Sequence, residues 1–149
     1  MESKDQPILK FSGVEIIRVI YNLKQNAPVG SKISMGSNFS VYYPEEEKNK
    51  FEIVTDLKIK CEEYFTIEVR AIGKFEVGEE ITEEMKTNFI NINTPAMVFP
   101  YLRAFISTFT ANTGAIGTVH LPPQFFSGSV KEIKKSELYL PDNSEEENS

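Results

Sequence analysis

The sequence predicts an α+β fold in which a four-stranded antiparallel β-meander is followed by a long helix. Four stretches in the first half of the chain alternate apolar and polar residues. This alternation is typical of strands in a sheet that is covered on one face and wet on the other. After Gly78 the period changes to that of helices, so the strands precede the helices instead of alternating with them.

The composition indicates one folded domain. The chain has 149 residues, 40% of them hydrophobic, and we expect a single domain over residues 1–140 with an acidic disordered tail at 141–149. The formal net charge of −6 argues against a nucleic-acid binder, which needs a basic surface. We expect a cytoplasmic protein for three reasons. The chain has a single cysteine, we identify no signal peptide, and no apolar run is long enough to span a membrane.

The predicted strands cover residues 11–24, 32–43, 51–61 and 64–77. In the first of them the apolar residues change parity at Ile16 and Ile17, which predicts a β-bulge there. The links at 44–50 and 62–64 are short and polar, so successive strands are expected to form hairpins within a meander.

Two helices are expected after the strands. Thr82 is a suitable N-cap for a short helix over 82–91, because acidic residues follow in the first turn. A longer helix then has Thr94 as its N-cap, Pro95 in its first position and Gly114 at its end.

Pro100 complicates the long helix. It lacks the N–H that would bond to residue 96, so the helix is either kinked there or begins near Phe99. The segment 127–140 further along the chain is compatible with a short strand or with a helical turn.

Large apolar side chains surround most of the long helix, whereas a helix that lies on one sheet needs only one apolar stripe. We therefore expect a second subunit on its other side. The alternative is that the C-terminal segment covers that side, but this segment is polar after Phe126. The expected oligomer interface consists of Val98, Tyr101, Leu102, Phe105, Ile106 and Phe109.

Few residues suit catalysis or metal binding. His120 is the only histidine, which excludes a His-pair metal site. A nucleophilic pair of Cys61 and His120 lacks an orienting group, and Cys61 continues the inward alternation of its strand, as a buried thiol does. We therefore expect a binding protein with no cofactor and no metal rather than an enzyme.

Two motifs resemble the protein-export chaperone family SecB. The stretch MVFPYLRAFI at 97–106 is followed about fifteen residues later by LPPQFF at 121–126. The residues that match the motifs of that family are Met97, Val98, Phe99, Pro100, Tyr101, Arg103, Ile106, Leu121, Pro123 and Phe126. The strands agree in order and length as well, so the resemblance covers about residues 10–126.

The resemblance implies a four-stranded antiparallel sheet and a dimer of dimers, with the long helices between the sheets of neighbouring subunits. It also implies a holdase that keeps unfolded precursor proteins competent for export and delivers them to the translocation motor ATPase. Such binding needs neither ATP nor a cofactor. It requires exposed aromatic surface that grips extended apolar segments without reading their sequence.

The best client-binding candidates are aromatic: Phe39, Tyr42, Tyr43, Phe125 and Phe126. Phe39 and Tyr43 follow the alternation of their strand, so ordinary core packing explains them at least as well. Tyr42 is out of phase and is expected to be exposed.

The sequence departs from the family in two places. SecB proteins have a second long helix after the Leu-x-Pro segment, and here that helix is short or missing. The family contacts the motor through acidic residues on its first strand, where this chain has Arg18 and Asn22. An oligomeric adaptor or antitoxin-type chaperone with one dedicated partner is therefore the alternative function, and an unrecognised small-molecule enzyme is the third.

Overall fold

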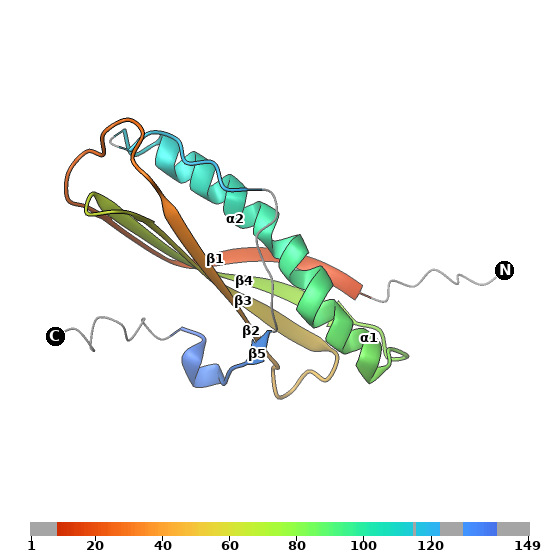
Figure 1. The fold of residues 1–149 in the computed structure, drawn as a ribbon. Coiled ribbons are helices and arrows are strands. Elements are labelled where there is room, and N and C mark those ends of the chain that lie inside the picture. The colour runs from red at the N-terminus through yellow and green to blue at the C-terminus, as the bar shows by residue number, and fades with distance from the viewer. Residues whose placement is uncertain (1–8, 115, 123–129, 140–149) are drawn as a thin grey trace.

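A computed structural model describes residues 9–114, 116–122 and 130–139. A five-stranded sheet carries the long helix on one face and a short C-terminal segment on the other (Figure 1). The strands are β1 (Leu9–Leu23), β2 (Ser34–Tyr42), β3 (Lys50–Cys61), β4 (Phe65–Val77) and β5 (Lys131–Glu132), and the α-helices are α1 (Glu83–Asn88) and α2 (Thr94–Ala111). The predicted α+β class is confirmed.

The strand order is β1-β4-β3-β2-β5, and every pair is antiparallel except the parallel pair β2–β5. Strands β2, β3 and β4 thus form the predicted meander, but β1 pairs with β4 instead of β2. The link 24–33 is long enough to cross the end of the sheet, and on the way the N–H of Lys24 donates to the carbonyl oxygen of Tyr64 (2.8 Å). The first four strands therefore form a Greek key rather than a simple meander.

β1 is irregular along its length. Its register against β4 shifts between Phe11 and Val14 and again between Ile16 and Arg18. The second shift confirms the bulge predicted at Ile16 and Ile17. The first contains Gly13, whose φ of +110° is readily adopted by glycine. Both bulges increase the local twist of the strand.

The main core lies between α2 and the inner face of the sheet. From the sheet it contains, among others, Phe39, Val41, Phe51, Ile53, Leu57, Ile59, Phe65, Ile67, Val69 and Phe75. Gly73 in β4 allows α2 to lie close, because a Cβ at Gly73 would lie 2.5 Å from Cγ2 of Val98. A side chain larger than hydrogen at this position would push α2 away from the sheet.

The chain stays helical from α1 into α2. Thr82 is the N-cap of α1 as predicted, since its Oγ1 accepts from the N–H of Met85 (3.1 Å). Thr94 is not an N-cap, because a π-helical turn, Phe89–Asn93, leads directly into α2. Such a wide turn is a common way to accommodate a missing helical hydrogen bond, and Pro95, which lacks an N–H, lies two residues after the end of the turn.

Pro100 lies inside α2 without ending it. Its missing N–H leaves the carbonyl of Ala96 without a helical donor. Ala96 and Pro100 are both exposed, so water can bond to that carbonyl. The helix ends at Ala111, and Gly114 follows with a φ of +74°, close to the predicted end.

Candidate functional site

Half of the predicted interface residues face the sheet of their own chain. The side chains of Val98, Leu102 and Ile106 are fully buried within a single chain. Their burial is therefore complete without a second subunit. The apolar character of these three residues does not require an oligomer interface. One apolar stripe of α2 covers the sheet, as expected for a helix on a sheet.

The other three predicted interface residues lie toward β1. Tyr101 packs edge-on against Phe11, and Phe109 packs edge-on against Tyr21, each with ring centroids 5.5 Å apart. Phe105 stacks on Phe109. Tyr101 remains 49% exposed, so this aromatic row is only partly covered by β1.

The side of α2 that faces away from the sheet carries a line of small residues. The sequence prediction considered only the large side chains of this helix and did not identify this line. These small residues are Ala96, Pro100, Ala104, Thr108 and Ala111. The segment 116–122 covers another side of α2, where the N–H of Val119 donates to Oγ1 of Thr110 (2.8 Å). Val119 and Leu121 are buried there. The alternative that later residues cover the helix thus holds in part.

Tyr42, the last residue of β2, and Tyr43, which directly follows it, lie on opposite faces of the sheet, and the third candidate of this stretch, Phe39, is buried in the main core. Tyr43 packs against the main core, and Nζ of Lys86 lies 4.9 Å from its ring centroid. Burial raises the pKa of the Tyr43 hydroxyl, and Glu132 and Glu83 add to this effect. Tyr42 is half-buried on the outer face, and the candidates Phe125 and Phe126 lie outside the described residues.

A second, smaller apolar cluster lies on that outer face. We call Val54, Ile72 and Leu138, all buried, the outer cluster; Ile17, Tyr42 and Ile133 pack around it. The sequence carries a signal for it that was not used: Val54 and Ile72 interrupt the polar positions of their strands. These two side chains need a cover that the helix cannot provide.

The segment 130–139, which we call the strap, provides that cover (Figure 1). Its strand β5 pairs with Ser40 and Val41 of β2, and the N–H of Ile133 donates to the carbonyl oxygen of Val41 (2.8 Å). A 3-10 turn, Lys135–Glu137, then brings Leu138 onto the outer cluster. The segment that was compatible with a strand or a helical turn contains both.

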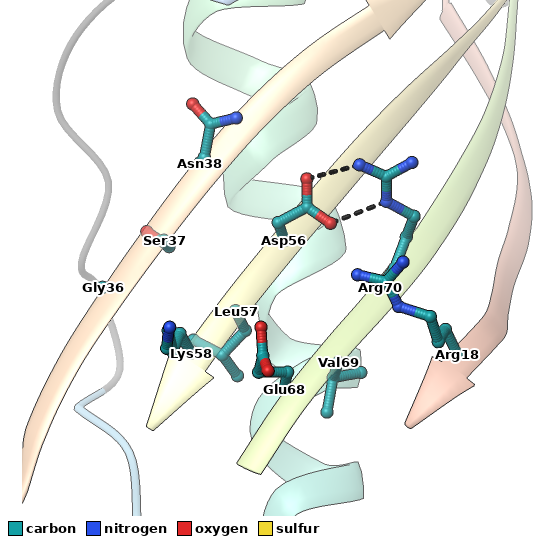
Figure 2. Close-up of a pocket in the computed structure, with 10 residues that line it drawn as sticks. All are labelled: Arg18, Gly36, Ser37, Asn38, Asp56, Leu57, Lys58, Glu68, Val69 and Arg70. Carbon is teal, nitrogen blue, oxygen red and sulfur yellow. Dashed lines mark hydrogen bonds and ion pairs between the residues drawn. The ribbon is translucent and has the colours of Figure 1, made fainter. Parts of the chain in front are cut away.

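Arg70 joins the strap to the sheet. Its Nε and Nη2 donate to Oδ1 and Oδ2 of Asp56 at 2.7 and 2.9 Å, as Figure 2 shows. Its Nη1 donates to the carbonyl oxygens of Glu137 (2.6 Å) and Leu138 (3.0 Å). The two-point contact with Asp56 fixes the plane of the guanidinium group, so Nη1 stays directed at the main chain of the strap.

A depression of about 350 Å³ lies beside this ion pair (Figure 2). Arg18, Asp56, Lys58, Glu68 and Arg70 are its charged lining residues. In the register of β3 and β4, Asp56 lies opposite Arg70 and Lys58 opposite Glu68, so opposite charges face each other across the strands. The outer face therefore carries mixed charge rather than the acidic surface that the resemblance to SecB implies, and Arg18 contributes a positive charge to it.

Three apolar side chains in or beside the link between β1 and β2 are exposed. Leu23, Val29 and Ile33 are exposed, Val29 completely, whereas Ala27 packs on the main core and anchors the link. The search for aromatic residues in the sequence missed this group because its members are aliphatic. Each of them offers exposed apolar area to another chain.

The structure does not favour the cysteine chemistry that the sequence left open. Cys61 is buried, and burial and Glu62 raise the pKa of its thiol, which disfavours the nucleophilic thiolate. His120 is exposed beside Arg103 and Ser107 of α2.

Within the described ranges no three His, Cys, Asp or Glu side chains converge in a metal-binding group. The helices in the same ranges are too short or too polar to span a membrane.

Comparison with known proteins identifies the family. The family model of SecB, preprotein translocase subunit SecB, matches residues 22–128. The chain belongs to the SecB family. A relative in Methanocaldococcus jannaschii, the uncharacterized protein MJ0357, is 34% identical over 146 residues, which cover 91% of this chain and 90% of that protein. The resemblance inferred from the motifs at 97–106 and 121–126 is confirmed.

A solved structure of low sequence identity shares the fold of this chain. It is the Mycobacterium tuberculosis SecB-like chaperone Rv1957 in complex with a ChAD peptide from the HigA1 antitoxin, Rv1956. It matches with a TM-score of 0.62 and 15% identity over 78% of this chain and 88% of the other. A protein of unknown function from Streptococcus agalactiae matches with a TM-score of 0.45 and 12% identity over 76% of this chain and 96% of that one.

Proposed function

We propose that this SecB-family protein is a chaperone of the holdase type, which binds unfolded or extended segments of other proteins without nucleotide. The match to the SecB family over residues 22–128 carries this proposal. The Mycobacterium tuberculosis chaperone of the same fold binds a peptide of another protein, which supports a peptide ligand. No part of the proposal requires a cofactor.

The exposed aliphatic group near the link between β1 and β2 is a suitable contact for such segments. Leu23, Val29 and Ile33 present apolar area without a fixed pattern of hydrogen-bonding groups, so they can bind many sequences. Burial of one such side chain contributes about 1.5–3 kcal/mol. Tyr42, Phe125 and Phe126 remain predicted client contacts, whereas Phe39, which is buried in the core, and Tyr43, which packs on the core, are weaker candidates.

An oligomer, in its full form a dimer of dimers, is the second part of the proposal. In the described part of the chain, the 15-residue strand β1 has a neighbour on one side only. Long unpaired edges tend to pair with another chain, so two β1 edges can join two sheets. The small residues along α2 permit a close approach of a second helix, and the partly exposed Tyr101 flanks them.

The finer form of the proposal is that the clients are export precursors in the cytoplasm, which the protein passes to the translocation motor ATPase. The mixed charge of the outer face, including Arg18, supports this delivery step less than an acidic face would. One dedicated partner is the alternative, favoured by the antitoxin peptide bound to the Mycobacterium tuberculosis chaperone.

Light scattering of a slow-folding precursor diluted out of urea tests the proposal. The wild-type protein is expected to suppress aggregation without nucleotide and also at moderate salt, because apolar contacts are weakly screened. The Leu23→Ser/Val29→Ser variant is expected to lose most of this effect. The Gln25→Ser/Asn26→Ser variant changes exposed polar residues of the same link and serves as the matched control.

A panel of unrelated unfolded proteins separates the two forms of the function. Suppression of aggregation for many of them supports a general holdase. Protection of none of them contradicts the holdase proposal, and protection confined to one protein supports a dedicated partner.

A further inference from the structure

We propose that the strap occupies a peptide-binding site on the outer face of the sheet, and that an extended segment of another protein with a branched aliphatic side chain can take its place. The inference rests on the proposed chaperone function for the identity of that other protein. The site itself is defined by Arg70, the outer cluster and the edge of β2 that pairs with β5.

The strap is held largely through its own main chain. The N–H of Ile133 donates to Val41, and the carbonyl oxygens of Glu137 and Leu138 accept from Nη1 of Arg70. Every peptide offers such N–H and carbonyl groups, as in other complexes in which a segment is added to the edge of a sheet. These contacts therefore do not require the sequence of the strap.

The selective contact is one side chain. Leu138 is 4% exposed and lies on Val54 and Ile72, while Ile133 packs beside them and is partly buried. The remaining side chains of the strap from Lys131 to Tyr139 are exposed. An incoming segment thus needs one aliphatic residue for the outer cluster and is otherwise free in sequence.

An incoming segment can also pair with more of β2 than the strap does. β2 extends over Ser34–Tyr42, but β5 pairs only with Ser40 and Val41. Directly before β5, the N–H of Val130 donates to Oδ1 of Asn91 (3.0 Å) and not to β2. Among the described residues, β5 is the one segment paired with this edge of β2, so a segment without the bond to Asn91 can continue along the edge and gain more main-chain hydrogen bonds.

The strap has the advantage of being part of the same chain. An attached segment competes at an effective concentration in the mM range for a short connection, so the strap covers Val54 and Ile72 when no client is present. A client that is already held elsewhere on the protein gains the same advantage and can displace it.

The test uses the full-length protein with a weakened strap. In the Ile133→Pro/Leu138→Asp variant, the strap loses the N–H that donates to Val41 and the side chain that covers the outer cluster. The probe is a fluorescein-labelled synthetic peptide with the sequence VKEIKKSELY, residues 130–139. By fluorescence anisotropy it is expected to bind the variant at least tenfold more tightly than the wild-type protein.

Two controls make the result specific. The Tyr139→Ser variant changes the exposed neighbour of Leu138 and is expected to bind the probe as weakly as the wild-type protein does. A probe with L138S is expected to lose its affinity for the double variant. On binding of the unchanged probe, the amide NMR signals of Val54 and Ile72 are expected to shift.

Equal affinity of the probe for the folded double variant and for the wild-type protein would overturn the inference, as would equal binding of the L138S probe. If the double variant does not fold, Leu138→Ser in the full chain replaces it, with an expected gain of at least threefold. If the probe does not bind as expected but the wild-type protein still suppresses aggregation, only the proposed peptide-binding site under the strap is contradicted. If the probe binds as expected but the wild-type protein does not suppress aggregation, only the proposed chaperone function is contradicted.

Discussion

Gly73 of β4 lies directly beneath Val98 of α2, and an alanine at this position tests how closely the helix is seated on the sheet. The added Cβ would lie 2.5 Å from Cγ2 of Val98 and 3.1 Å from the ring of Phe75, well inside the favourable carbon–carbon separation of about 3.5–4.0 Å. Val98 is fully buried and β-branched, so its side chain has little freedom to rotate away. The helix or the strand must move.

The cost of Gly73→Ala follows from two opposing effects. Overpacking of a core costs about 1–3 kcal/mol, and removal of a glycine from a strand recovers about 0.5–1 kcal/mol. We therefore expect a loss of about 1–2 kcal/mol, which corresponds to a decrease in Tm of roughly 2–8 °C for a chain of this size. Gly36→Ala is the matched control, since a Cβ on Gly36 of β2 meets no atom within 4 Å.

A double-mutant cycle locates the effect at the helix. Val98→Ala alone should cost about 2 kcal/mol for the lost buried methyl groups. In the double variant the methyl group of residue 73 has room, so the total cost should be smaller than the sum by about 1 kcal/mol or more. Urea unfolding followed by circular dichroism measures all four proteins. Additive effects, or equal effects of the two glycine substitutions, would refute the close contact between α2 and β4.

Three further predictions concern the outer face and the assembly. Arg70→Met should lower stability by about 2 kcal/mol, because it leaves the half-buried Asp56 carboxylate without its donors; Arg70→Met/Asp56→Asn should recover part of this loss in urea unfolding. Burial raises the pKa of Glu52 despite the opposing Lys74, so its ionisation destabilises the fold as the pH rises through that pKa. Glu52→Gln should therefore raise the urea midpoint at pH 7 but not below about pH 4, and an equal gain at both values would contradict this. Phe105→Asp should reduce the mass measured by light scattering if α2 lies at a subunit interface, and an unchanged mass would place the interface elsewhere.

The local elements of this protein were predictable from the sequence. Alternation predicted four strands within a few residues of their ends, since side chains in a strand point to opposite faces in turn. The change of parity at Ile16 predicted the bulge, and Thr82 predicted the start of α1. Each of these depends on neighbours in the sequence. The motif at 97–106 likewise indicated the SecB family, which the comparison confirmed.

Arrangements that depend on distant residues were not predictable in this way. No local pattern states that β1 lies beside β4, because a long link permits either neighbour. The periodicity of α2 showed many large apolar residues but not which of them meet the sheet, and Val98, Leu102 and Ile106 proved to be covered by their own chain. The sequence also did not predict the π-helical turn before Pro95. Local preference favours a break in the helix there, whereas the packing of α2 against distant residues keeps the helix continuous.

By itself the sequence determined the family, the α+β class and the positions of the strands, because these follow from motifs and from periodic side chains within a short stretch. Only the tertiary structure decided the use of the surfaces. It separated Tyr42 from Tyr43 onto opposite faces, and it brought Leu138 to Val54 and Ile72 and the main chain of the strap to Arg70. Those contacts join residues more than 60 positions apart, and their free energy comes from burial and hydrogen bonds that exist only when the sheet is complete.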